Sequence, residues 1–151
     1  MKKKIAIFLI LVMALTLIAG CGSEKTVVTR QGNDGSKSEV NVPDKKGGDV
    51  SLPEGYPKEL VPIFAGSQIE LADKNEENGK TTYLISLSSS KSVEDVFNYY
   101  KDVLKDAQNF NSSKTEDISS VAGVKNNLQI SVMISPDDKK TSFQIAIAPK
   151  K

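Results

Sequence analysis

The feature that most limits how this chain can fold is that only one of its patterned segments has helical spacing. Ser92 is followed three residues later by Asp95, which is typical of a capping box at the start of a helix. The apolar residues then recur at intervals of three and four, as one face of an amphipathic helix requires. They are Val93, Val96, Phe97, Tyr100, Val103, Leu104 and Ala107. The sequence therefore predicts a single helix over residues 92–109.

Two segments before this helix have apolar residues at every second position, which is the strand pattern. Residues 67–72 place Ile69 and Leu71 on one face, and residues 81–88 do the same with three apolar residues. The polar stretch between them contains Asn78-Gly79, a strong signal for a tight turn. This pattern predicts a β-hairpin.

The segments after the helix also alternate, although less evenly. Residues 128–134 and 143–147 each have apolar residues at every second position, with a turn at 136–140 between them. Residues 110–126 are less regular, and from Ile118 to Val124 either one strand or a loose hairpin fits the pattern. The predicted element order is therefore ββαβ(β)β.

One helix can cover one face of one sheet, so the predicted fold class is a two-layer α+β domain. It has one amphipathic helix on an antiparallel sheet of about 4–5 strands. The opposite sheet face would carry small polar residues and is interpreted as a solvated surface. These residues are Ser86, Ser88, Gln129, Ser131, Ser142 and Gln144.

The globular domain is expected to span residues 52–151. Residues 52–67 contain three Pro and several apolar residues, which indicates an ordered lead-in. Residues 22–51 contain no aromatic residue and no Leu, Ile or Phe, so they cannot bury enough apolar surface to offset their ordering entropy. Residues 21–51 are therefore predicted to be a flexible linker, in which Val27–Val28 and Val40–Val42 could form short strand pieces.

The N-terminus has the three parts of a secretory signal peptide. Three lysines at positions 2–4 precede an apolar run from Ile5 to Ile18, and small residues lead to Cys21. A membrane-spanning helix is the alternative, but it needs about 20 apolar residues and this run is shorter. The sequence therefore predicts that residues 1–20 form a signal peptide that is cleaved.

The end of this run, Leu17-Ile18-Ala19-Gly20-Cys21, resembles the lipobox of bacterial prolipoproteins. The resemblance implies cleavage between Gly20 and Cys21, lipidation of the Cys21 thiol, and attachment to the extracytoplasmic face of the cell membrane. The alternative is an ordinary signal peptide with a chance cysteine. Removing residues 1–20 leaves 17 basic against 19 acidic side chains, a net charge of −2. Anionic lipid would not attract such a chain, so the Cys21 lipid is the expected membrane attachment.

A second resemblance covers residues 53–108. Tyr56-Pro57, the stretch from Val61 to Ser67, the hairpin and the Phe97–Lys101 segment of the helix are similar to a domain of uncharacterised lipoproteins of Gram-positive bacteria. The resemblance implies a fold and a location, but it implies no activity.

Composition argues against several classes of function. The chain has no His and one Cys, which removes the usual zinc ligands and the commonest acid–base side chain. Its net charge of +1 gives no basic excess for nucleic acid. No cofactor or metal is expected, although a weak calcium contact is possible at Asp73, Glu76 and Glu77 or at Asp137 and Asp138.

No complete catalytic motif is present. Ser88-Ser-Ser-Lys91 matches the S-x-x-K pattern of serine acyltransferases, but the companion elements S-D-N and K-T-G are absent. Six acids stand where solvent should keep them ionised: Glu54, Glu59, Glu94, Asp95, Glu116 and Asp117. The predicted function is a non-catalytic binding or accessory module that binds an envelope protein, a wall polymer or a small ligand. The alternative is a small envelope hydrolase using Ser and Lys or a carboxylate pair.

Overall fold

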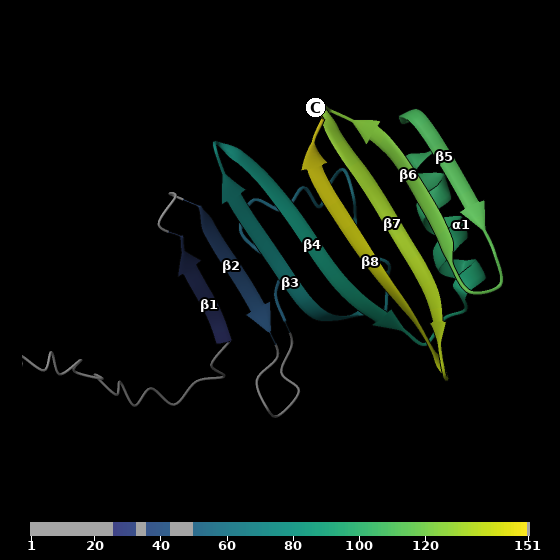
Figure 1. Ribbon diagram of the computed structural model, residues 1–151. Helices are drawn as coiled ribbons and strands as arrows, with labels where there is room; N and C mark the ends of the chain where they lie inside the picture. Colours follow the sequence, from purple (N-terminus) through teal and green to yellow (C-terminus); the bar gives the residue numbers. More distant parts are fainter. Residues whose placement is uncertain (1–25, 33–35, 43–49, 151) are drawn as a thin grey trace, which may run out of the picture.

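The computed structural model describes residues 26–32, 36–42 and 50–150 (Figure 1). These residues form one eight-stranded antiparallel sheet and one helix, with strand order β1-β2-β3-β4-β8-β7-β6-β5. The elements are β1 Thr26–Gln31, β2 Lys37–Val42, β3 Gln68–Glu77, β4 Lys80–Ser89, α1 Val93–Leu104, β5 Gln108–Lys114, β6 Ser119–Lys125, β7 Leu128–Asp137 and β8 Lys140–Pro149.

The predicted fold class is wrong. The sequence predicted a two-layer α+β domain with about 4–5 strands in the order ββαβ(β)β, whereas the described residues have four strands before the helix and four after it. The protein is therefore mostly one large sheet, and the helix is a 12-residue element on part of it.

Two of the additional strands, β1 and β2, lie within residues 21–51, which the sequence predicted to be a flexible linker. They form a hairpin that extends the sheet from the β3 edge through β2–β3 pairing. Val27 and Val28 remain 48% and 38% exposed, so most of what holds β1 is its ladder of backbone hydrogen bonds with β2. An argument from apolar composition does not predict such a strand, because the strand buries little apolar surface.

The other additional strand is β5, which begins four residues after α1 ends. Its sequence QNFNSSK has one apolar residue, and most of its side chains are exposed. It lies at the sheet edge and pairs with β6 on one side only. An edge strand of this kind has no apolar alternation to read, so the sequence left the pairing of residues 110–126 open. In the structure, Gln108–Lys114 and Ser119–Lys125 form a hairpin.

The predicted hairpin pairings are confirmed, but the prediction that Ile69 and Leu71 share one face is wrong, because a bulge pairs Ile69 with Leu87 and Leu71 with the adjacent Ser86. β3 pairs with β4, and β7 pairs with β8 along their whole lengths. The β3–β4 turn is Asn78-Gly79, and both residues have positive φ (51° and 71°), as a tight two-residue hairpin turn requires. The strands reach closer to this turn than predicted, which shortens it to two residues.

Helix α1 begins at the predicted capping box. The Asp95 N–H donates to Ser92 Oγ at 3.1 Å, and the Ser92 N–H donates to the Asp95 carboxylate at 3.2 Å. The helix ends at Leu104, earlier than the predicted residue 109. Ala107 instead packs against β6, where a Cβ atom on Gly123 would lie 2.5 Å from the Ala107 Cβ. Gly123 thus allows the chain after α1 to approach the sheet closely.

The hydrophobic core lies between one face of the sheet and α1, and we call this the covered face. Strand register brings Ala72, Ile85, Ile145, Val132 and Val121 into one row across five strands. Each of these side chains is 0% exposed. From the helix, Val96, Phe97, Tyr100 and Leu104 pack into this layer.

Residues 50–67, which we call the strap, cross the same face behind β3, β4 and β8 (Figure 1). Tyrosine hydroxyls from β4 and α1 hold it, and a third, from Tyr56, makes a hydrogen bond within it. Tyr83 donates to the Gly55 carbonyl at 2.8 Å, Tyr56 to the Val61 carbonyl at 3.0 Å, and Tyr100 to the Pro62 carbonyl at 3.3 Å. Burial raises the pKa of Tyr56 and of Tyr100 well above the usual range. The predicted ordered lead-in is confirmed, and together with α1 it covers one face only.

Candidate binding site on the open face of the sheet

The sheet face that α1 and the strap leave uncovered, which we call the open face, carries the alternate residues of the same strands. Strand register aligns Leu71, Ser86, Gln144, Met133 and Ser120 in a row across β3, β4, β8, β7 and β6. Three of the large apolar side chains exposed on the described residues lie here: Leu84 is 39% exposed, Ile118 46% and Met133 50%. Exposed large apolar side chains that lie together with a hollow mark a candidate interaction surface.

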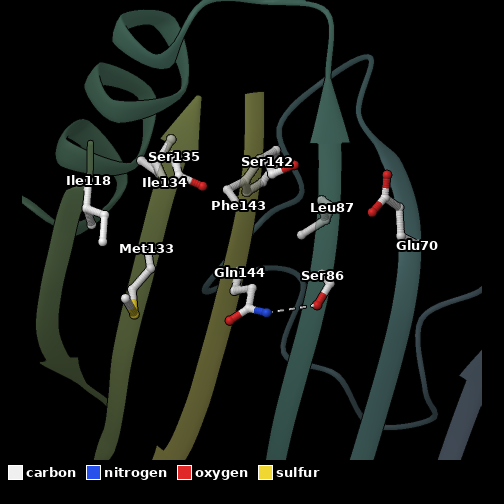
Figure 2. Close-up of a pocket in the computed structure, with 10 residues that line it drawn as sticks. All are labelled: Glu70, Ser86, Leu87, Ile118, Met133, Ile134, Ser135, Ser142, Phe143 and Gln144. Carbon is white, nitrogen blue, oxygen red and sulfur yellow. Dashed lines mark hydrogen bonds between the residues drawn. The ribbon is translucent and has the colours of Figure 1, made fainter. Parts of the chain in front are cut away.

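The open face contains a hollow of about 430 Å³ (Figure 2). That volume lies in the range of small-molecule sites. Residues of β3, β4, β8 and β7 line it, together with Ile118 just before β6. Three of these residues, Leu87, Ile134 and Phe143, have side chains that are only 1%, 1% and 2% exposed and pack into the core of the covered face. The lining residues are Glu70, Ser86, Leu87, Ile118, Met133, Ile134, Ser135, Ser142, Phe143 and Gln144.

The middle of this hollow is polar but uncharged. The Gln144 amide Nε2 donates to Ser86 Oγ at 3.4 Å, which links the β8 and β4 side chains across its floor (Figure 2). Ser142 Oγ donates to the Asp137 carboxylate at 3.0 Å. A hydroxyl and an amide each have more than one donor or acceptor position. These residues can therefore still hydrogen-bond a ligand.

The two ends of the hollow differ in chemistry. Ile118 and Met133 form an apolar end over β6 and β7, whereas Glu70 lies at the β3 end (Figure 2). Glu70 occupies a β-bulge, because Ile69 pairs with Leu87 and Leu71 pairs with the adjacent Ser86. A bulge re-aims a side chain relative to the regular pleat. Within the described residues, the Glu70 carboxylate makes no ion pair and no hydrogen bond.

A second hollow of about 350 Å³ continues the open face along the same strands. Asp73 and Leu84 lie at its β3 and β4 side, and Ser38 Oγ donates to the Asp73 carboxylate at 3.3 Å. The lining residues are Asp73, Asn75, Thr82, Tyr83, Leu84, Gln129, Ser131, Ala146, Ile147 and Ala148.

Most of the residues predicted to form the polar sheet face do line these hollows. Ser86, Ser142 and Gln144 line the first, and Gln129 and Ser131 line the second. Ser88 lines neither and is only 3% exposed. The sequence interpretation as a plain solvated surface missed the hollows and also missed Glu70, Ile118 and Met133. Met133 had a readable signal, because it alternates with the buried Val132 and Ile134.

The S-x-x-K motif forms the end of β4 and the entry to α1. The Lys91 N–H donates to Ser89 Oγ at 3.1 Å, and the Lys91 carbonyl accepts from Thr141 Oγ1 at 2.7 Å. Across the described part of the chain, no hydrogen bond joins the Ser88 hydroxyl and the Lys91 amine. The motif's observed contacts fasten the chain as it leaves the sheet.

The six acids considered for acid–base chemistry are exposed and do not line either hollow. Glu94 forms an ion pair with Lys114, and this hydrogen bond together with one from Asn98 lowers the pKa of Glu94. Hydrogen bonds from Ser92 lower the pKa of Asp95. Both groups therefore stay ionised at neutral pH, as helix-start acids do.

The calcium candidates do not converge either. Asp73 lies on the open face, whereas strand alternation places Glu76 on the opposite face. There Glu76 forms an ion pair with Lys74 at 2.9 Å. Asp137 and Asp138 lie at the β7–β8 turn beside Lys139 and Lys140. Among the described residues, no group of three or more acids, His or Cys is placed to hold a metal ion.

The predicted lipidation and cleavage residues, Cys21 and Gly20, lie outside the described residues. Within the described ranges, no helix is both long and apolar enough to cross a membrane.

Comparison with known proteins gave one match. The family described as START domain-like matches residues 69–142, just under half of the chain. The matched segment runs from the start of β3 to the first residues of β8, and it contains most of the residues that line the larger hollow. Neither the search of curated proteins nor the search of solved structures found a match. This chain is therefore similar to START domain-like proteins over its central strands and helix.

Proposed function

We propose that this protein is a lipid-anchored bacterial lipoprotein on the extracytoplasmic face of the cell membrane, and that its open sheet face binds a ligand without catalysis. The observation that carries the binding proposal is the larger hollow, where exposed Ile118 and Met133 stand beside uncharged hydrogen-bonding groups. A concave surface with apolar lining and a few polar groups is the usual form of a ligand site.

The START domain-like match supports the same proposal, because it suggests a ligand-binding fold and covers most of the hollow. The described residues bring no serine–lysine pair and no pair of carboxylates together in either hollow. Binding is therefore the function that these side chains support better than the alternative of a small hydrolase.

The lipobox-like end of the signal peptide supports the anchoring proposal. The sheet begins at Thr26, only a few residues after Cys21. An extended chain spans at most about 3.6 Å per residue, so the start of β1 would lie within about 18 Å of the lipid-bearing residue. The domain is therefore held close to the membrane surface, closer than a linker reaching to residue 51 would hold it.

The anchor is tested by replacing Cys21 with Ser and labelling growing cells with a fatty acid. We expect the label to disappear from the C21S protein and to remain on a Ser23→Ala control. Fatty-acid label that persists on the Cys21→Ser protein would overturn the anchoring proposal.

The binding site is tested with a methyl reporter. The chain has three Met, and two of them, Met1 and Met13, lie in the predicted signal peptide. Labelling methionine with a ¹³C-methyl group therefore places a reporter, Met133, at the apolar end of the hollow. We expect an organic extract of bacterial envelopes to shift the Met133 methyl signal. Gln144→Arg, which puts a large cation on the neighbouring strand, should abolish the shift.

The matched control is Asn98→Arg on the exposed side of α1, which should leave the shift unchanged. A Met133 signal that does not respond to the extract would contradict the proposed binding function. A response that is equal in the Gln144→Arg protein would also contradict it, because the ligand would then bind elsewhere.

A further inference from the structure

We infer that the ligand of the larger hollow is a cationic amphiphile, with its apolar part over Ile118 and Met133 and its ammonium or guanidinium group at Glu70. The inference rests on the proposed binding function and names the class of ligand. Three features of the hollow carry it. Its charged lining residue is acidic, that carboxylate has no ion-pair or hydrogen-bond partner among the described residues, and the apolar end lies at a definite distance from it.

The charged side chains that line the two hollows are both acidic, Glu70 and Asp73. Among the described residues, no Lys or Arg lines either hollow. The β3 lysine, Lys74, ion-pairs with Glu76 at 2.9 Å instead. An anionic headgroup in the larger hollow would therefore find no counter-charge among its lining residues and would be repelled by the Glu70 carboxylate.

Glu70 is the acid available to pair with a ligand. Several other carboxylates already have cationic partners: Glu76 has Lys74, Glu94 has Lys114 and Asp102 has Lys105. Asp73 accepts a hydrogen bond from Ser38. Glu70 has neither kind of partner within the described residues, and its bulge places it at the end of the hollow.

The two ends are separated by a definite number of strands. Glu70 is on β3 and Met133 is on β7, with β4 and β8 between them. Neighbouring strands are about 4.8 Å apart, so the backbone positions are about 14 Å apart across the sheet. A positive group joined to an alkyl chain of about ten carbons spans that distance, with Ser86 and Gln144 beneath it.

The apolar end should supply most of the binding affinity. Glu70 should supply the selectivity for a positively charged ligand over a negatively charged one. A solvent-accessible ion pair changes affinity only about threefold to fivefold, whereas like charges disfavour binding by a comparable factor. The test must therefore compare probes of opposite charge and equal chain length, and compare variants of the protein rather than absolute affinities.

The experiment uses the full chain in phosphatidylcholine nanodiscs, with methionine ¹³C-methyl labelling to follow Met133. The probes are decylammonium, decanoate and butylammonium, each titrated against free probe concentration. We expect decylammonium to shift the Met133 signal at the lowest concentration and butylammonium to have little effect. Glu70→Gln should weaken decylammonium about threefold to fivefold and should not weaken decanoate. Glu77→Gln, an exposed acid at the far end of β3, should change neither titration.

Decanoate binding as tightly as decylammonium, with no effect of Glu70→Gln, would overturn the inference and leave the proposed binding function standing. A response to envelope extract but to none of the three probes would have the same meaning. Failure of both the probes and the extract would overturn the inference and the proposed function together. A Met133 shift that depends on protein concentration alone would identify a second copy of this chain as the occupant instead.

Discussion

The two faces of this sheet are built from the same strands and differ in almost everything else. On β7, Val132 and Ile134 are 0% and 1% exposed beneath α1, whereas Met133 between them is 50% exposed on the other side. On β8, Phe143 and Ile145 are buried and Gln144 between them is exposed. Alternation by one residue thus separates a packed layer from a hollowed surface.

The difference supports the proposal that the covered face provides stability and the open face provides binding. The covered face has α1, the strap and the tyrosine hydrogen bonds, so its side chains are already in contact with the protein. The open face has apolar and hydrogen-bonding groups that α1 and the strap leave uncovered. Substitutions on the first face should act on folding, and substitutions on the second should act on binding.

The largest contrast is expected between neighbours on β7. Ile134→Ala removes a fully buried side chain and should lower the free energy of unfolding by about 2–5 kcal/mol, because a cavity remains. Met133→Ala removes a half-exposed one and should change it by about 0.5 kcal/mol or less. Urea unfolding of the two variants measures both values. Equal losses would mean that the open face is packed against something.

A smaller contrast tests whether the strap belongs to the covered face. The Tyr100 hydroxyl donates to the Pro62 carbonyl and accepts from the Phe64 N–H, each at 3.3 Å. Tyr100→Phe leaves both strap groups without this partner and should cost about 1–3 kcal/mol. Tyr99→Phe, on the adjacent residue, keeps its ring contacts and should cost about 0.5 kcal/mol or less. Amide hydrogen exchange should be faster across the strap only in the first variant.

The smallest effect concerns the ion pair between α1 and β5 at the margin of the covered face. Lys114 and Asn98 lower the pKa of Glu94 from its ordinary value of 4.5. Charged Glu94 therefore stabilises the fold above pH 4.5, and this contribution is lost as the pH falls through the lowered pKa. Between pH 6 and pH 3, the melting temperature of Glu94→Gln should fall slightly less than that of the wild type.

Lys114→Gln should reduce the fall in melting temperature between pH 6 and pH 3 in the same way. The double variant should show no further reduction than either single variant. A steeper fall in either variant would show that the pair does not stabilise the helix against the sheet edge.

Local patterns predicted those parts of the fold that bury apolar side chains. The capping box located the start of α1, and alternation located the β3–β4 and β7–β8 pairs. β5 was missed, and β1 and β2 were expected only as short pieces at Val27–Val28 and Val40–Val42 within a flexible linker. All three lie at the margins of the sheet and are fixed mainly by backbone pairing, which any residue except Pro can supply. The strand count of about 4–5 was wrong for this reason.

The candidate site was predicted less completely than the fold. Sequence alternation placed Ser86 and Gln144 on the uncovered side, but it could not show that the sheet is hollowed there. Sequence alternation did not predict Glu70 as a lining residue, because its position depends on a bulge between β3 and β4 that shifts the register by one residue. Such a bulge has no readable signal in the segment Gln68–Leu71.

The most direct test of the division between the two faces is to measure folding and binding in one variant, Gln144→Arg. Gln144 is exposed at the centre of the larger hollow, and its partner there is a single 3.4 Å hydrogen bond. We expect the urea midpoint to stay within the error of the wild type, and the Met133 methyl response to envelope extract to vanish. A protein that unfolds more easily and still responds to the extract would contradict the account.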